Sequence, residues 1–359
     1  MKRLLLSGTV GIMLIVLFTG LSAQENQVSK NYHQEYPVSK NSSLLIENKY
    51  GSIDVKNWNE NRITIDVVVK LDNHNKDKAK KQLEQIKIEF SQNGDEIKAI
   101  TNFDDNFSSG HGWFNSDNRE MTINYTVNMP ASLDVTLKNK YGDIFINELT
   151  GKTEIYLKYG NLKANKILRS NSEPLAYLNM GYANGSIEEC SWLKMDLKYS
   201  KLNIEKSKAL VIVSKYSKLM IEDCSSIVAE SKYDEYKVEK LTNIVVTAGY
   251  TGFTFGEISR KIDANIRYGD FKVGKIPATF ESIKIDNEYG GVRLAIDPDA
   301  SYMINGHARY AKIVVPEEGK LSRIEENTSS TISGVVGKNE ATKSKVTIET
   351  SYGGVKLKD

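Results

Sequence analysis

Six lysines hold fixed places beside a recurring tyrosine, and they are the residues of this sequence best suited to bind a ligand. They are Lys158, Lys198, Lys201, Lys215, Lys218 and Lys232. Lys198, Lys215 and Lys232 directly precede tyrosines and follow one another at intervals of 17 residues. In a stack of strands, such a column would place one ammonium group about every 4.8 Å. We expect this column to form a linear track for an anionic polymer, such as an acidic polysaccharide.

The same column has a simpler interpretation as a solvated face. Neighbouring like charges repel by about 1 kcal/mol per pair at most in water, which a folded protein tolerates. Glu205, Glu222 and Glu239 recur at the same interval and would partly neutralise the lysines from the following strand. The sequence leaves both interpretations open.

The spacing of the acidic residues and histidines gives little support for enzymatic chemistry. Exported β-helical lyases and glycosidases need convergent carboxylates, or a base beside a cation, within a groove. The glutamates here instead recur as an even outward column. The four histidines, none of which forms a pair with metal-binding spacing, are His33, His74, His111 and His307. We therefore predict a protein without catalytic residues, and a polysaccharide-active β-helical enzyme is the less favoured alternative.

One polar loop contains the best candidates for metal ligands. These are Asp104, Asp105, His111 and Asp117. A flexible acidic loop is the simpler explanation of this composition. We predict neither a metal nor a cofactor.

The tyrosines that accompany the lysines define a repeat. Tyr199, Tyr216, Tyr233 and Tyr250 are 17 residues apart, and the interval lengthens to 21 further along the chain. The adjoining words also match, as in Lys140-Tyr141-Gly142-Asp143-Ile144, Arg267-Tyr268-Gly269-Asp270-Phe271 and Tyr352-Gly353-Gly354-Val355. A fixed period of this kind is typical of a stacked repeat architecture.

Within a repeat, apolar and polar residues alternate, which is the pattern of a strand with one buried face. Apolar residues stand four positions before the tyrosine and three and five positions after it, as Ile212, Leu219 and Ile221 do around Tyr216. Gly or Ser mostly follows the tyrosine and marks a corner. We predict an all-β fold, a single-stranded parallel β-solenoid (β-helix) of about 17–21 residues per turn, with the tyrosines stacked as one ladder.

Two turns depart from the repeat. Met180-Gly181 takes the place of Tyr-Gly in one turn, and the turn expected near Thr331 has no tyrosine. We interpret both as drifted units of one solenoid over residues 129–359.

The chain before the solenoid divides into three parts. A basic start, an apolar run and Ser22-Ala23-Gln24 predict a cleavable signal peptide over residues 1–23. Residues 24–40 are polar and are expected to form a flexible leader. Residues 41–128 are expected to cap the open end of the solenoid with the first repeat turn, several strands and one short helix over Asn75–Ile86.

Charge and hydropathy narrow the location and the partners. Loss of Lys2 and Arg3 with the signal peptide would take the formal net charge from +2 to about zero. A neutral chain without a basic tail argues against nucleic acid as the partner. No second apolar run has the length of a transmembrane segment. We expect an exported protein of the periplasm, the outer surface or the extracellular medium.

The order of these motifs resembles a known family. A Tyr-Gly-x-Ile-x-Val word at 50–55 precedes the helical segment at 79–86, and two strand words follow. These words are Ile123-Asn124-Tyr125-Thr126-Val127-Asn128-Met129-Pro130 and Leu137-Lys138-Asn139-Lys140-Tyr141-Gly142-Asp143-Ile144. The order resembles the bacterial putative-adhesin domain family of secreted β-helical proteins, common in Bacteroidetes, over nearly all of the mature chain. The resemblance implies a secreted or envelope-located β-solenoid that is adhesin-like, and it supplies no catalytic residues.

We therefore expect an exported, non-catalytic, adhesin-like β-solenoid that presents an extended surface to an anionic polysaccharide or another surface polymer. The alternative is a structural or signalling protein of the envelope whose partner is another protein.

The two cysteines are expected to be free thiols. Cys190 and Cys224 share one phase of the repeat and lie two turns apart, with Ser207 between them. Two turns span about 9.6 Å, which exceeds the reach of about 7 Å between the Cα atoms of a disulfide.

The last repeat is expected to leave an exposed edge strand over Tyr352–Asp359. Such an edge is a pairing hazard. The charges of Lys356 and Lys358 would disfavour strand pairing at this edge, or a second copy of the chain would cover the edge by weak self-association.

Overall fold

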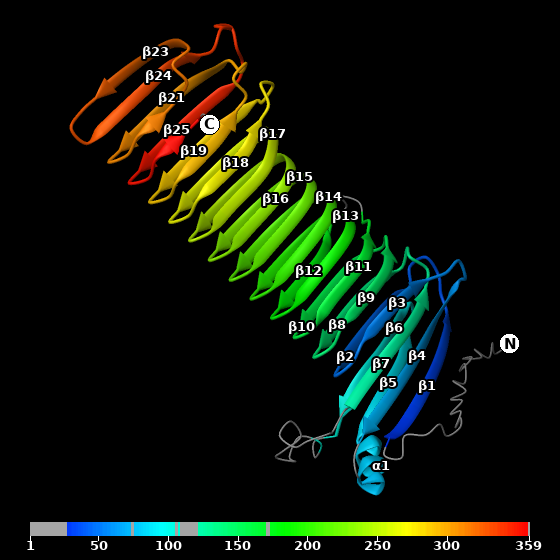
Figure 1. Cartoon of the computed structure of the whole chain (residues 1–359). Helices are drawn as coiled ribbons and strands as arrows, with labels where there is room; N and C mark the ends of the chain where they lie inside the picture. Colours follow the sequence, from blue (N-terminus) through cyan, green and yellow to red (C-terminus); the bar gives the residue numbers. More distant parts are fainter. Residues whose placement is uncertain (1–26, 73–74, 105–106, 108–120, 170–172, 358–359) are drawn as a thin grey trace, which may run out of the picture.

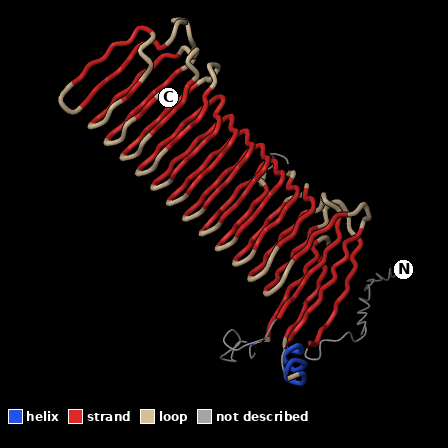
Figure 2. The backbone as a smooth tube through the Cα atoms, viewed as in Figure 1, coloured by secondary structure: helices blue, strands red, loops and turns tan. Residues whose placement is uncertain are grey.

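Strands stacked in one long row dominate the structure (Figure 1). The computed structural model describes residues 27–72, 75–104, 107, 121–169 and 173–357. Within these residues it contains one helix and a 26-stranded sheet. The helix lies at one end of the row and the last strands lie at the other (Figure 2). The predicted all-β class and the single short helix are confirmed.

Each repeat turn contributes one strand before a tyrosine corner and one strand after it. The separate strands before the corner are β2 (Ser43–Lys49), β8 (Asp134–Lys140), β10 (Thr153–Lys158) and β12 (Ala176–Gly181). Those after the corner are β3 (Ile53–Asn57), β9 (Ile144–Leu149) and β11 (Asn161–Ile167). In the middle of the row the strand after one corner continues into the strand before the next. These long strands are β13 (Asn184–Lys198), β14 (Lys201–Lys215), β15 (Lys218–Lys232), β16 (Glu235–Gly249) and β17 (Gly252–Arg267).

Like positions of successive turns are aligned in parallel register. Leu202 of β14 is the partner of Leu219 of β15, and Ile212 is the partner of Ala229. The apolar residues of each turn point inward, so that Leu202, Leu219 and Ile212 are at most 1% exposed. One continuous apolar core therefore runs along the row, and each turn is stabilised by its neighbours.

The tyrosine at each corner has a left-handed backbone conformation. Twelve tyrosines have φ between 51° and 65°, a region that costs a non-glycine residue about 1–2 kcal/mol. In several turns the next residue is glycine because a side chain has no room. A Cβ atom on Gly142 would fall on the carbonyl oxygen of Gly51, far inside van der Waals contact. The predicted corner is confirmed, and the tyrosine itself forms it.

The structure corrects the interpretation of Met180-Gly181 as a turn without its tyrosine. Tyr182, with φ 53°, forms this corner, and Met180 is buried in the core. The interval from Tyr159 to Tyr182 is 23 residues, and the regular interval of 17 to Tyr199 follows. The longer connection, rather than a lost tyrosine, breaks the period here.

An antiparallel block closes the N-terminal end of the row. Its elements are β1 (Gln27–Pro37), β4 (Arg62–Asp72), α1 (Lys76–Glu84), β5 (Ile86–Asn93), β6 (Glu96–Phe103) and β7 (Met121–Met129). β6 and β7 pair in parallel with β2 and β3 of the first turn, and β5 and β4 then pair antiparallel with them. The side chain of Asn75 caps α1 by accepting a hydrogen bond from the N–H of Lys78, and Ala79 is buried.

The first strand of this block contradicts one prediction. Residues 27–37, expected within a flexible leader over 24–40, form β1 and pair with β4 along its whole length. Val28 and Tyr36 of β1 are buried, and the polar residues between them hide this pattern. The predicted signal peptide over 1–23 lies outside the described residues.

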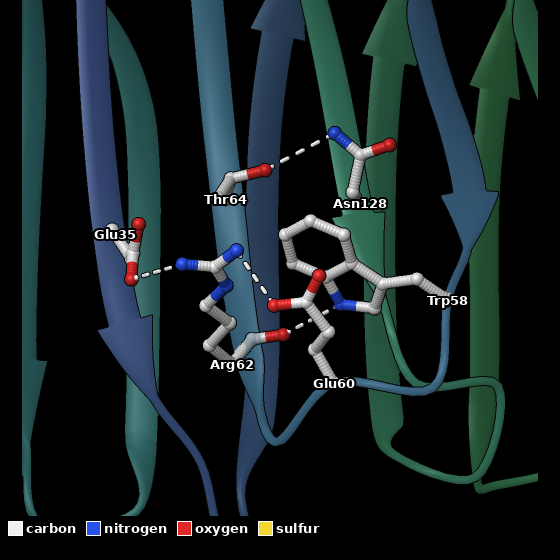
Figure 3. A network of polar contacts seen from close by, with 6 residues as sticks. All are labelled: Glu35, Trp58, Glu60, Arg62, Thr64 and Asn128. Atoms are coloured by element: carbon white, nitrogen blue, oxygen red, sulfur yellow. Dashed lines mark hydrogen bonds and ion pairs between the residues drawn. The ribbon is translucent and has the colours of Figure 1, made fainter.

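Arg62 of β4 stabilises the end of β1 through an ion pair. Its guanidinium lies 2.9 Å from a carboxylate oxygen of Glu35 and 2.6 Å from one of Glu60 (Figure 3). The same group lies 5.0 Å from the ring centre of Trp58, whose indole N–H donates to the carbonyl of Arg62. The hydrogen bond that Arg62 donates to Glu35 is the largest cause that raises the pKa of Arg62.

The strands at the other end of the row do not follow one another in sequence order. They are β18 (Phe271–Ile276), β19 (Ser282–Glu288), β20 (Val292–Ile296), β21 (Tyr302–Arg309), β22 (Ile313–Val314), β23 (Gly319–Glu325), β24 (Ser329–Val336), β25 (Lys345–Ser351) and β26 (Val355–Lys356). β25 lies between β19 and β21 and is parallel to both. β26 lies in the same way between β20 and β22. Beyond β21, β24 and β23 pair antiparallel.

Two predictions about this end are therefore wrong. Residues 319–336 form an antiparallel hairpin instead of a parallel solenoid turn, which explains why the turn near Thr331 has no tyrosine. The strand of the last repeat is not an edge, because Lys356 pairs with Arg293 on one side and Val314 on the other. Among the described strands, the outermost one beside β26 is β22, and the outermost one on the β25 side is β23, which is largely exposed. Lys358 lies outside the described residues.

Candidate ligand-binding surface

The corner tyrosines form one continuous stack along the row, and their side chains are exposed from Tyr141 onward. Eleven ring contacts join them, with centroids 4.7–5.4 Å apart and ring planes within 19° of parallel. Their order is Tyr50, Tyr141, Tyr159, Tyr182, Tyr199, Tyr216, Tyr233, Tyr250, Tyr268, Tyr289, Tyr352 and Tyr310. The rings from Tyr199 to Tyr250 lie 4.9 Å from their neighbours, as predicted. We call this stack the tyrosine ladder.

Side chains next to the corner hold the tyrosine ladder in place. In the middle turns the residue after the tyrosine accepts a hydrogen bond from the backbone of the preceding turn. Ser217 Oγ accepts from the N–H of Ser200 at 3.2 Å, and Asp234 Oδ1 accepts from the N–H of Ser217 at 2.6 Å. In a glycine turn, Asn139 supplies the contact instead, donating to the carbonyl of Gly51 at 2.8 Å. These contacts were not predicted from the sequence. The asparagine that stands two positions before some of the tyrosines, such as Asn139 before Tyr141, could have indicated them.

Asp234 is a buried carboxylate with a structural role. Its Oδ2 accepts hydrogen bonds from the hydroxyls of Ser214 and Ser231, both at 2.7 Å, and from the N–H of Lys232 at 3.0 Å. Buried charges persist when they are fully hydrogen-bonded. The carboxylate is therefore engaged in stabilising its own corner.

The structure brings five of the six candidate lysines together beside the ladder. Lys198, Lys215 and Lys232 are direct register partners in adjacent strands. Lys201 and Lys218 form a second column on the other side of the tyrosines. The ammonium groups of Lys215 and Lys232 lie 5.2 and 5.5 Å from the ring centres of the tyrosines that follow them. We call Lys198, Lys215 and Lys232 the lysine track.

Lys158 stands apart from the lysine track by one turn. Gly181 is its register partner on one side and the partner of Lys198 on the other. A Cβ atom on Gly181 would meet only the side chain of Lys158, at 3.6 Å or more. The column is therefore interrupted because residue 181 is glycine, although the structure has room for a side chain there.

Acidic residues neutralise only part of this surface. Lys218 contacts Glu235 at 2.9 Å, whereas the lysine track forms no ion pair within the described residues. The expected neutralisation by Glu205, Glu222 and Glu239 is not seen as direct contact. Among the described ion pairs, that glutamate column contributes only the pair of Glu239 with Lys237.

Another outward column shows how this fold balances its charges. Its register partners alternate in sign over seven strands and are Glu148, Lys166, Glu189, Lys206, Asp223, Lys240 and Glu257. Lys275 continues the alternation with an ion pair to Glu257 at 3.2 Å. A balanced column is thus available to this fold, and the lysine track departs from it with three like charges in a row.

Shallow grooves flank the tyrosine ladder in these same turns. One groove is lined by the lysine track, by the acidic residues Asp196 and Glu230, and by apolar residues such as Leu197 and Val213. The other is lined by the tyrosines from Tyr199 to Tyr250 with Lys201 and Lys218. Val213, Val228 and Val245, on the outer face beside the first groove, are 43–50% exposed. The arrangement can bind an elongated ligand along the row through ammonium groups and aromatic edges.

The polar loop that holds the candidate metal ligands is described only in part. Asp104 contacts the ammonium group of Lys87 at 2.7 Å, and Asp105, His111 and Asp117 lie outside the described residues. Within the described ranges no group of histidine, cysteine or acidic residues could hold a metal ion. His33 and His307 lie at opposite ends of the row and contact Asp66 and Thr331 respectively.

Both cysteines are free, as predicted, and both are buried. Ser207 is the register partner of Cys190 on one side and of Cys224 on the other. Burial raises the pKa of the Cys190 thiol to about 12. The thiols are therefore neutral core groups under ordinary conditions.

The repeat turns and the exposed ladder define a class of protein: an all-β repeat protein with an elongated outer surface. Residues 41–358 match the family described as Toastrack DUF4097. The chain therefore belongs to this β-solenoid-like family, and the predicted resemblance to an adhesin-like domain family is confirmed. A comparison with curated proteins gave no match.

Three solved structures are similar to this chain at low identity. A putative cell adhesion protein from Clostridium sporogenes is 9% identical with a TM-score of 0.19, over 92% of this chain and 99% of that one. A putative lipid binding protein from Parabacteroides distasonis is 12% identical with a TM-score of 0.38, over 68% and 96%. A putative adhesin from Bacteroides fragilis is 12% identical with a TM-score of 0.32, over 72% and 97%. In the part of this chain that the structure describes, no helix is suited to crossing a membrane.

Proposed function

We propose that this protein is an exported, non-catalytic, adhesin-like binding protein whose lysine track and tyrosine ladder bind an anionic polymer of the surface, such as an acidic polysaccharide. The observation that carries the proposal is the lysine track itself. Lys198, Lys215 and Lys232 are stacked in register without an acidic partner among the described residues, in a fold that elsewhere alternates its charges.

The geometry supports a polymer rather than a small molecule. Successive turns repeat the same groups about every 4.8 Å, so a ligand with regularly spaced carboxylates or sulfates could engage several rungs at once. Each further rung binds at a high effective concentration once the first is occupied. Single contacts on an exposed surface are weak, and only their repetition gives useful affinity.

A binding role without catalysis fits the acidic residues of the described chain. Catalytic carboxylates of glycosidases lie about 5–9.5 Å apart across a scissile bond. Here the outward acids such as Glu189 and Asp223 alternate with lysines, and the buried Asp234 is occupied by its own hydrogen bonds. These surroundings favour structural roles for the carboxylates.

A protein partner is the second candidate, and the exposed valines favour it. Val228 and Val245 are exposed register partners in adjacent strands and form a small apolar patch on the outer face. Exposed apolar patches often mark protein interfaces. If the envelope partner is a protein, Val228→Ser with Val245→Ser should abolish its capture while leaving polysaccharide binding unchanged.

Charge reversal of the lysine track tests the main proposal. The variant Lys198→Glu/Lys215→Glu/Lys232→Glu is compared with a control of equal charge change in one other column of the fold, Lys163→Glu/Lys237→Glu/Lys272→Glu. The probes are alginate, a polyuronate, and dextran, a neutral polymer. We expect alginate binding by wild type and control, at least a tenfold loss in the track variant, equivalent to about 1.4 kcal/mol, and an unchanged melting temperature. Equal alginate binding by all three proteins would refute the proposal.

Export is tested in the native cells. Fractionation combined with protease treatment of intact cells should find the mature protein outside the cytoplasm. Surface exposure favours the adhesin-like role, and a protected periplasmic pool favours the envelope alternative.

A further inference from the structure

One late segment of the chain is inserted between two turns that precede it in the sequence. The chain runs through β19–β20, then β21–β22 and the β23–β24 hairpin, before β25–β26 returns. β25 pairs with β19 over seven residues and with β21 over seven residues. We call residues 345–357 the inserted repeat, and the space between β19–β20 and β21–β22 the slot.

The inserted repeat is equivalent to a complete turn of the row. Its word Tyr352-Gly353-Gly354-Val355 matches Tyr289-Gly290-Gly291-Val292 of the neighbouring turn. The ring of Tyr352 stacks 4.8 Å from Tyr289 and 5.0 Å from Tyr310. One tyrosine of the ladder therefore comes from a segment that lies later in the sequence than both of the turns it stands between.

The slot cannot close when the inserted repeat is absent. Val346, Ile348 and Val355 are at most 1% exposed and complete the core at this rung. Without them, β19 and β21 would stand two strand spacings apart, about 9.6 Å, which is too far for direct pairing. Both strand edges would then be open to another strand.

The connection to the inserted repeat is polar and outside the core. None of residues 337–344 is buried, and residues 338–341 are exposed. Ser301 fastens this connection, because its Oγ accepts from the N–H of Asn339 at 3.1 Å and its carbonyl accepts from Thr342 Oγ1 at 2.5 Å. The connection can take another course without loss of buried apolar contacts.

We propose that the slot is a strand-acceptor site that also takes the inserted repeat of a second copy of this chain. The exchanged repeat makes the same strand pairs and the same tyrosine stacking as the chain's own repeat, so only the connection at 337–344 differs between the two states. Exchange of an identical element is a low-cost route to assembly. The proposal is independent of the ligand-binding function proposed above.

An engineered disulfide distinguishes the two states. His307 of β21 and Glu349 of β25 are register partners, and the strand spacing of about 4.8 Å lies within the range of about 4.4–6.8 Å for the Cα atoms of a disulfide. In His307→Cys/Glu349→Cys, made with Cys190→Ser and Cys224→Ser, the new disulfide is intramolecular in a closed monomer and intermolecular after exchange. The full chain is refolded at rising concentration, oxidised, and analysed by non-reducing electrophoresis.

We expect covalent dimers whose fraction rises severalfold with the concentration during refolding. The matched control His307→Cys/Thr347→Cys, in which the thiols are two residues out of register, should give few. A purely intramolecular disulfide at every concentration would overturn the proposal. The wild-type chain, refolded in the same series and followed by light scattering, provides a second measurement. Concentration-dependent dimers support strand exchange, and a strict monomer contradicts it even if the engineered variant fails to fold.

Discussion

Each corner of this protein places a tyrosine where glycine has the lower backbone cost. Tyr216 has φ 52° and stacks 4.9 Å from both Tyr199 and Tyr233. Stacked aromatic pairs contribute about 0.5–1.5 kcal/mol each beyond burial, whereas the left-handed conformation costs about 1–2 kcal/mol. The two effects are of similar size, so stacking can hold the side chain in its strained position.

Two substitutions at one corner separate these effects. Tyr216→Ala loses the stacking and keeps the strain, whereas Tyr216→Gly loses the stacking and relieves the strain. We expect the glycine variant to be more stable than the alanine variant by about 1 kcal/mol in urea unfolding. Equal stability of the two variants would show that the corner is not strained.

A glycine beside a corner tyrosine is required only where backbones approach closely. A Cβ atom on Gly142, which follows Tyr141, would fall on the carbonyl of Gly51, whereas a Cβ atom on Gly249, which precedes Tyr250, meets nothing within 4 Å. We expect Gly142→Ala to lower the free energy of unfolding by about 3 kcal/mol and Gly249→Ala to change it by less than about 0.5 kcal/mol. Similar losses in thermal unfolding would contradict this account of the corner.

The buried thiols give a pH dependence with a defined sign. Burial raises the pKa of Cys190 from 9.0 to about 12, so the folded state favours the neutral thiol. The corresponding stability is complete below pH 9 and decreases as the pH rises from about 9 toward 12. We expect no thiol labelling of the native protein at pH 8 and two labelled thiols after denaturation without a reductant. Fewer than two would reveal a disulfide and refute the prediction.

At the scale of elements, the repeat could be predicted because the residue pattern of each turn indicates its two strands and its corner. Alternation around Tyr216 identifies two strands, and the small residue at Ser217 identifies the corner. The charged columns were equally accessible, since a parallel stack places residues 17 apart beside one another. Lys198, Lys215 and Lys232 are therefore where the spacing placed them.

Other elements could not be read from local pattern. β1 looks like a polar leader because its inward residues Val28 and Tyr36 are separated by polar ones. The strand order at the C-terminal end of the row depends on which strands pair with one another. The spacing of the tyrosines does not indicate these pairings. The interval of 42 residues from Tyr310 to Tyr352 equals two turns of 21, yet it contains an antiparallel hairpin and a return into the slot.

The gap in the lysine column provides a gain-of-function test. Gly181→Lys would join Lys158 to the lysine track through adjacent rungs. Added repulsion of about 1 kcal/mol per pair at most in water should leave the fold intact. We expect tighter alginate binding with a steeper salt dependence than wild type, measured by titration calorimetry. Gly181→Gln is the neutral control, and equal binding by the lysine and glutamine variants would exclude a role for added charge.

At the scale of the molecule, the candidate binding surface is a row of similar turns rather than a single pocket. The antiparallel block closes one end and the β23–β24 hairpin extends the other (Figure 1). Between them the tyrosine ladder is continuous, while the lysine track occupies only the turns of Lys198 to Lys232. We therefore expect a ligand to bind lengthwise over these middle turns, with an affinity set by the number of turns that it contacts.

Titration with oligouronates of increasing length is the most direct test of this claim. Affinity should rise with each added sugar until the chain spans the lysine track and then level off. It should fall steeply as salt shortens the Debye length to about 3 Å at 1 M. The track variant Lys198→Glu/Lys215→Glu/Lys232→Glu should show neither dependence. An affinity independent of oligomer length and of salt in the wild-type protein would contradict the account.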